Sequence, residues 1–139
     1  MTEMRTRPIN TKFGKLYATS WWRNGELIPD ERVRFFDEYD RLLDYYENDT
    51  ILEWCEAEGH TPEHWIEEYC KVIEEKETIE DLLEYMCVEY DYCGTSKVEA
   101  IKALANGDPE DAATITDYEL QTNEWVIIIG EYYIVMREY

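Results

Sequence analysis

Basic residues are scarce in this sequence. Among its 139 residues, 13 are Lys or Arg and 33 are Asp or Glu, which leaves a formal net charge of −20. A protein this negative is repelled by the phosphates of nucleic acids and by anionic lipid headgroups, so direct binding to either is disfavoured. A basic protein partner is favoured instead.

Long apolar runs are also lacking, because the longest extends only from Trp125 to Ile129. A membrane-spanning helix needs about 20 apolar residues, and the first residues show no basic-then-apolar signal pattern. The four cysteines form no CxxC pair, which favours reduced thiols; they are Cys55, Cys70, Cys87 and Cys93. These features predict a cytoplasmic protein that does not bind membranes.

Motifs for catalysis or cofactor binding are missing as well. The six glycines form no phosphate-binding loop, and no nucleophile stands beside a histidine in a recognisable pattern. His60 and His64 have a metal-like spacing, but Pro62 begins a helix between them, so they are not expected to share a helical face. The sequence therefore predicts no enzyme activity, no metal and no cofactor.

The chain does have enough apolar residues, 45%, for one hydrophobic core, and we expect a single domain over residues 1–139. Near the amino terminus, β-branched and aromatic residues predict a strand from Lys15 to Trp22. Asn24-Gly25 then predicts a turn into a short return strand, Glu26 to Ile28.

Helical spacing dominates the middle of the sequence. A helix is predicted after Pro29-Asp30 because apolar residues recur every three or four positions, at Val33, Phe36, Tyr39, Leu43 and Tyr46. Four more are predicted: from Asp49 or Thr50 to Gly59, from the cap Thr61 and Pro62 onward, from Thr78 to near Gly94, and from Ser96 to Asn106.

After Asp108-Pro109 the spacing changes to short runs typical of strands. These runs are Ile115 to Gln121, Trp125 to Ile129 and Tyr132 to Arg137, with Gly130-Glu131 as a hairpin turn. We therefore predict an α+β fold. A small antiparallel sheet combines the N-terminal strand with a C-terminal three-stranded meander, about 114–138, and a central cluster of four to five helices, about 30–106, lies on one face.

Charge is distributed unevenly along the chain. Residues 1–36 carry +3, whereas residues 37–91 hold 20 acidic and three basic side chains, a net charge of −17. On the predicted helices the acids form three rows: Asp37, Asp40, Asp44 and Glu47; Glu63, Glu67, Glu68, Glu74 and Glu75; and Glu80, Asp81 and Glu84. Tyr45 is expected to point outward among them and to anchor an interface.

The basic N-terminal segment has two possible roles. Its residues Arg5, Arg7, Lys12 and Lys15 either form a tether or pair with the protein's own acidic face. The sequence alone leaves both open.

Small size, acidity concentrated in mid-chain and tyrosines among the carboxylates resemble the acidic DNA-mimic inhibitors of phages and mobile elements, the anti-CRISPR and antirestriction proteins. The resemblance implies a non-enzymatic inhibitor that binds a basic nucleic-acid-binding protein, a host-defence nuclease, as a monomer or homodimer. Two alternatives stay open. One is an acidic adaptor or regulator whose basic partner is unrelated to nucleic acid, and the other is an acidic surface that is merely solvated.

Overall fold

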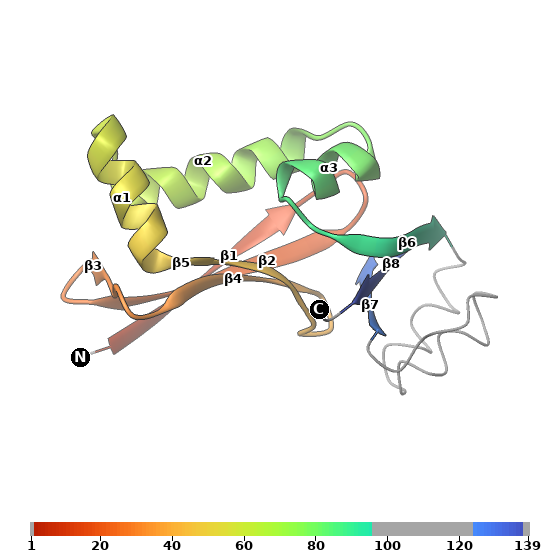
Figure 1. The fold of residues 1–139 in the computed structure, drawn as a ribbon, viewed down its shortest axis with the longest axis horizontal. Coiled ribbons are helices and arrows are strands. Elements are labelled where there is room, and N and C mark those ends of the chain that lie inside the picture. Colours follow the sequence, from red (N-terminus) through yellow and green to blue (C-terminus); the bar gives the residue numbers. More distant parts are fainter. Residues whose placement is uncertain (1, 96–123, 138–139) are drawn as a thin grey trace.

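The computed structural model describes residues 2–95 and 124–137 and contains two antiparallel sheets with three helices (Figure 1). The first sheet has the order β1-β2-β4-β5, and β3 pairs with β2; the second has the order β6-β8-β7. The strands are β1 (Thr2–Asn10), β2 (Lys15–Arg23), β3 (Glu26–Leu27), β4 (Arg32–Asp37), β5 (Leu42–Glu47), β6 (Tyr90–Thr95), β7 (Glu124–Ile129) and β8 (Tyr132–Arg137). The helices are α1 (Asn48–Glu58), α2 (Pro62–Glu75) and α3 (Ile79–Tyr85).

The main core lies between the five-stranded sheet and the helices, all of which lie on one of its faces (Figure 1). Alternate residues of β2, including Leu16, Ala18 and Trp22, point toward the helices and are buried. They belong to the same hydrophobic cluster as Ile73 of α2 and Leu82 of α3. Most of the polar residues of the helices lie on their outer surfaces.

The two sheets are joined through Asp37, which lies at the end of β4 and is fully buried. Its Oδ1 accepts hydrogen bonds from the backbone N–H groups of Tyr39 and Arg41, both at 2.9 Å, and its Oδ2 accepts one from Ile128 of β7 at 3.0 Å. The Arg41 guanidinium donates to the Val126 carbonyl oxygen at 3.1 Å. Burial raises the pKa of Asp37, although its three backbone donors partly oppose this effect.

The predicted fold class is wrong in its number of helices and in its sheets. Among the described residues there are three helices instead of four to five, and a five-stranded and a three-stranded sheet replace the single small one. The helix predicted after Asp30 is the hairpin β4–β5. The apolar residues of this segment recur at helical spacing because they come from two short strands and the turn between them. The turn contains Asp40, whose φ is 60°, and the strand pairing shifts between Phe35 and Phe36.

The strand β1 was not predicted. It is polar and contains Pro8, as an edge strand can, and it pairs along its whole length with β2. The helix at Thr78 ends at Tyr85 and not near Gly94, because Cys87 has a φ of 56° and β6 follows.

Several local predictions are confirmed. The helix predicted up to Gly59 is α1, and Gly59 caps it with a φ of 72°. Thr61 and Thr78 cap α2 and α3 through their side chains, and the hairpin β7–β8 turns at Gly130. The predicted helix from Ser96 to Asn106 and strand from Ile115 to Gln121 lie outside the described residues.

Candidate functional site

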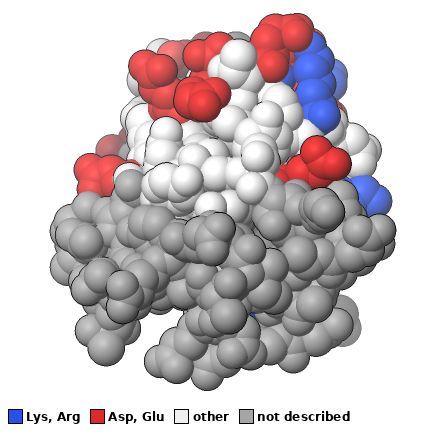
Figure 2. All heavy atoms as spheres, turned by 90° about the vertical axis from the view of Figure 1, so that its right-hand side faces the viewer, with Lys and Arg blue, Asp and Glu red and all other residues white. Residues whose placement is uncertain are grey.

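Negative charge is concentrated in the helical layer. Residues 48–85 contain 13 acidic and two basic side chains, a net charge of −11, whereas residues 2–47 contain nine acidic and eight basic ones. Because the helices share one face of the sheet, this charge lies on one side of the molecule (Figure 1). Figure 2 shows several Asp and Glu residues at the top, where the helices lie, beside a smaller basic group.

Part of this charge is neutralised by β1. The Arg7 guanidinium binds Glu67 at 2.9 Å and Glu74 at 3.1 Å, and Arg5 lies 4.0 Å from Glu63. These hydrogen bonds to Arg7 lower the pKa of both Glu67 and Glu74. Lys12 also pairs with Glu77. Of the two roles predicted for the basic N-terminal segment, pairing with the protein's own acids is confirmed for these three residues.

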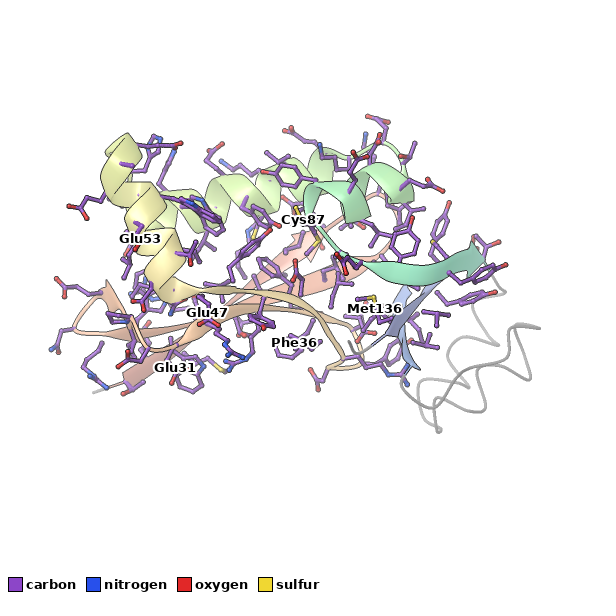
Figure 3. The ribbon with its side chains drawn as sticks, viewed as in Figure 1. Glu31, Phe36, Glu47, Glu53, Cys87 and Met136 are labelled. Carbon is purple, nitrogen blue, oxygen red and sulfur yellow. The ribbon has the colours of Figure 1, made fainter. Side chains whose placement is uncertain are left out.

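The acids predicted as a row along residues 37–47 do not share a face. Asp37 is buried, Asp40 lies in the β4–β5 turn, and Asp44 is half-buried on the side of β5 that faces the helices. Glu47 and Tyr45 point the other way, since they pair with Arg32 and Arg34, and Figure 3 shows Glu47 below the ribbon of β5. The reason is the strand geometry of this segment, in which successive side chains alternate between faces.

Both outward residues of β5 contact Arg32 of β4. Its guanidinium lies 3.0 Å from the Glu47 carboxylate and 4.5 Å from the centroid of the Tyr45 ring. Tyr45 is therefore separated from the acidic helices by the sheet, and it stacks with a cation of its own chain.

Other predicted acids of α2 and α3 are exposed. Of the ion pairs among the described residues, only the weak contact between Glu68 and Lys71, at 3.9 Å, involves one of them. The sequence prediction missed the three exposed glutamates of α1, although the predicted helix and its glutamates at positions 53 and 56, one turn apart, were a usable signal. We call the combined set the acidic helix surface: Glu53, Glu56, Glu58, Glu68, Glu75, Glu80, Asp81 and Glu84.

A row of aromatic rings crosses the three helices next to these acids. Trp54 of α1, Trp65 and Tyr69 of α2 and Tyr85 of α3 form this aromatic row, with successive ring centroids 5.8, 5.1 and 5.2 Å apart. Its ends are open to solvent, since Trp54 is 42% and Tyr85 36% exposed. Beneath it, the Tyr46 hydroxyl lies 2.9 Å from that of Tyr69, and burial raises the pKa of both tyrosines.

A groove of about 310 Å³ lies along the aromatic row. Trp65, Tyr69 and Tyr85 line its apolar side, and Glu58 and Glu68 provide carboxylates. We call it the aromatic–acidic groove.

Two histidines complete the lining of this groove. The ring centroids of His60 and His64 are 4.9 Å apart. The two rings are therefore closer than we expected from Pro62, which begins α2 between them. His60 Nε2 lies 3.6 Å from a carboxylate oxygen of Glu58.

At the end of the aromatic row, the ring of Tyr85 already contacts a cation. The Lys76 ammonium lies 4.6 Å from its centroid, and Asp81 and Glu84 line the same hollow. An ammonium group held over an aromatic face and beside carboxylates is a cation–π arrangement.

Asp44 is a carboxylate without a cationic partner in the described residues. Its only hydrogen bond there comes from the backbone N–H of Tyr45, at 2.8 Å, and burial raises its pKa to about 6. It shares a face of β5 with Tyr46 and interacts electrostatically with Tyr46 and Tyr69. It therefore adds negative charge below the aromatic row.

Within residues 2–95 and 124–137, no three His, Cys, Asp or Glu side chains are grouped as metal ligands would be. The helices of this part of the chain are all too short or too polar to cross a membrane. No protein-family model matches the chain, and no curated protein or solved structure is significantly similar to it. The site is therefore interpreted from its own charges and contacts.

Proposed function

We propose that this protein is a non-enzymatic inhibitor that binds a basic, nucleic-acid-handling protein through the acidic helix surface, in the place of a phosphate backbone. The observation that carries the proposal is the separation of charge. Residues 48–85, which form the helical layer, hold a net charge of −11, and the sheet residues 2–47 are nearly neutral. A surface of one sign attracts and orients a partner of the opposite sign.

The charge density supports a comparison with duplex DNA. The 14 residues of α2 span about 21 Å, a length over which a duplex carries about 12 phosphate charges. Arg5, Arg7 and Lys12 offset three of the helical charges, which leaves about −8 on this side of the molecule. The helical layer therefore presents about two-thirds of the charge of the duplex.

The protein keeps this charge although it weakens the helices. Glu80 and Glu84 are one turn apart on α3, both are exposed, and neither has an ion pair among the described residues. A like-charged pair at this spacing destabilises a helix by about 0.2–0.5 kcal/mol. A binding role for the surface gives a reason to retain such pairs.

The test is a pull-down with tagged protein from nuclease-treated bacterial lysate, eluted with a salt gradient and repeated with duplex DNA as competitor. We expect DNA-binding proteins or nucleases that salt elutes steeply and that duplex DNA displaces. Partners that are indifferent to DNA would contradict the inhibitor role and favour an acidic adaptor. Absence of any partner would favour a merely solvated surface.

A matched pair of variants locates the binding surface. Replacing Glu75, Glu80 and Glu84 by lysine changes the net charge from −20 to −14, and so does replacing Glu26, Asp30 and Glu38, which are exposed outside the helices. We expect the first variant to lose the partner and the second to retain it. Equal loss in both would mean that only total charge matters, and the acidic helix surface would not be the site.

A further inference from the structure

We propose that the aromatic–acidic groove receives an arginine side chain of the basic partner, so that the surface recognises a particular residue in addition to its charge. This inference rests on the proposed function. The groove has the two components that a guanidinium requires. Aromatic rings come from Trp65 and Tyr85, and carboxylates from Glu58 and Glu68.

The chain itself shows how a cation is held at this row. Lys76 places its ammonium 4.6 Å from the Tyr85 ring centroid, in a hollow that Asp81 and Glu84 also line. The aromatic–acidic groove, which Tyr85 also lines, has the same combination of ring and carboxylate. Its carboxylates have only long contacts with basic groups of their own chain, since Lys71 is 3.9 Å from Glu68 and His60 is 3.6 Å from Glu58.

The size and charge of the groove favour a cationic side chain over a larger or anionic ligand. At about 310 Å³ it is at the lower limit of small-molecule pockets, too small for a helix or strand of a partner. The surrounding net charge of −11 on residues 48–85 disfavours phosphates and carboxylates as ligands. A cationic side chain fits both conditions.

Arginine suits this groove better than lysine for a geometric reason. Its guanidinium is planar and weakly hydrated, so that it can stack on an aromatic ring while it donates hydrogen bonds to a carboxylate in its own plane. The ammonium of lysine is compact and strongly hydrated, and gives up more water when it enters a groove lined by Trp65, Tyr69 and Tyr85. We therefore expect selectivity for arginine at equal peptide charge.

The experiment measures the affinity of the full chain for octaarginine and octalysine peptides by calorimetry at low salt. We compare the wild type with Glu68→Gln and Glu75→Gln, which each remove one exposed charge from α2, although only Glu68 lines the groove. Tyr85→Leu is compared with Tyr45→Leu, whose ring is 42% exposed on the opposite face of the sheet.

We expect octaarginine to bind at least about fivefold more tightly than octalysine. Glu68→Gln should weaken octaarginine binding about tenfold and Glu75→Gln by less than about twofold, and Tyr85→Leu should weaken it more than Tyr45→Leu.

Two results would overturn the proposal in different ways. If both peptides bind equally and each variant behaves like its control, the groove is not an arginine site, while the proposed function stands on charge alone. If neither peptide binds at low salt, the acidic helix surface does not attract basic partners, and the proposed function fails as well.

Discussion

The ion pairs of Arg7 hold α2 to β1, and replacing Arg7 by methionine tests this attachment. Arg7 is 25% exposed and reaches both Glu67, at 2.9 and 3.2 Å, and Glu74, at 3.1 and 3.2 Å. Hydrogen bonds between charged groups contribute about 1.5–3 kcal/mol each when buried, whereas exposed ion pairs contribute about 0–1 kcal/mol. Since Glu67 is 45% exposed, we expect a total loss of about 2 kcal/mol in the free energy of unfolding.

This loss corresponds to a fall in melting temperature of about 8 °C for a domain of this size. Methionine keeps an apolar stem of similar length, so the change isolates the charge and its hydrogen bonds. Thermal and urea unfolding followed by circular dichroism would measure both quantities at pH 7.

The pH dependence of the loss has a definite sign. Arg7 lowers the pKa of Glu67 and Glu74 in the folded protein. A carboxyl group with a lowered pKa stabilises the fold above its unfolded pKa, near 4.5, and loses this contribution as pH falls through the folded value. The difference in the free energy of unfolding between wild type and Arg7→Met should therefore be largest above about pH 5 and should decrease toward pH 3.

Arg32→Met is the control, because the Arg32–Glu47 pair is equally short at 3.0 Å but about half exposed at both ends. We expect it to cost less than about 1 kcal/mol. If Arg7→Met is no more destabilising than Arg32→Met, or equally destabilising at pH 3 and pH 7, the attachment of α2 through Arg7 is refuted.

Three more substitutions have expected outcomes that urea unfolding can measure. Asp37→Ala should destabilise the protein by about 3 kcal/mol, because three backbone donors lose their acceptor. Asp40→Ala, in the same turn, should cost less than about 1 kcal/mol. Equal effects of the two substitutions would mean that Asp37 does not connect the two sheets. Asp44→Asn should stabilise the protein by about 1 kcal/mol at pH 7 and not at pH 3. The pKa of Asp44 is about 6 in the folded protein and near 3.8 in the unfolded chain, so its charged form destabilises the fold. No gain in stability at pH 7 would show that Asp44 is solvated. Gly14→Ala should destabilise the protein by about 2 kcal/mol, because an added Cβ would collide with the backbone of Gly130. Unchanged stability would mean that the β1–β2 loop and the β7–β8 turn are not in contact.

Signals within a few residues of each other were sufficient to predict several elements. Thr61 followed by Pro62, and Thr78, were predicted as helix caps, and their side chains accept hydrogen bonds from His64 and Asp81. Each cap depends only on residues three positions away, so the sequence contains the whole interaction. The hairpin at Gly130 was predicted for the same reason.

The failures occurred where distant pairing decides the structure. Residues 32–47 have apolar positions at helical spacing, but β4 lies between β2 and β5, and pairing with both neighbours outweighs this local pattern. The strand β1 lacks an apolar pattern of its own and becomes a strand through β2. Because β1 pairs with β2 beside α2, its arginines also reach three of the predicted acids. Arg7 forms ion pairs with Glu67 and Glu74, and Arg5 lies close to Glu63.

The sequence by itself determined the total charge, its concentration in the middle of the chain and the N-terminal caps of α2 and α3 at Thr61 and Thr78, because these depend on composition and close neighbours. Only the tertiary structure decided which acids are exposed and which are buried or paired. Arg7 and Glu67 are 60 residues apart in the chain, and Asp37 and Ile128 are 91 apart. Their contacts form only when the sheets and helices pack, because burial and charge pairing depend on distances in space that local spacing does not encode.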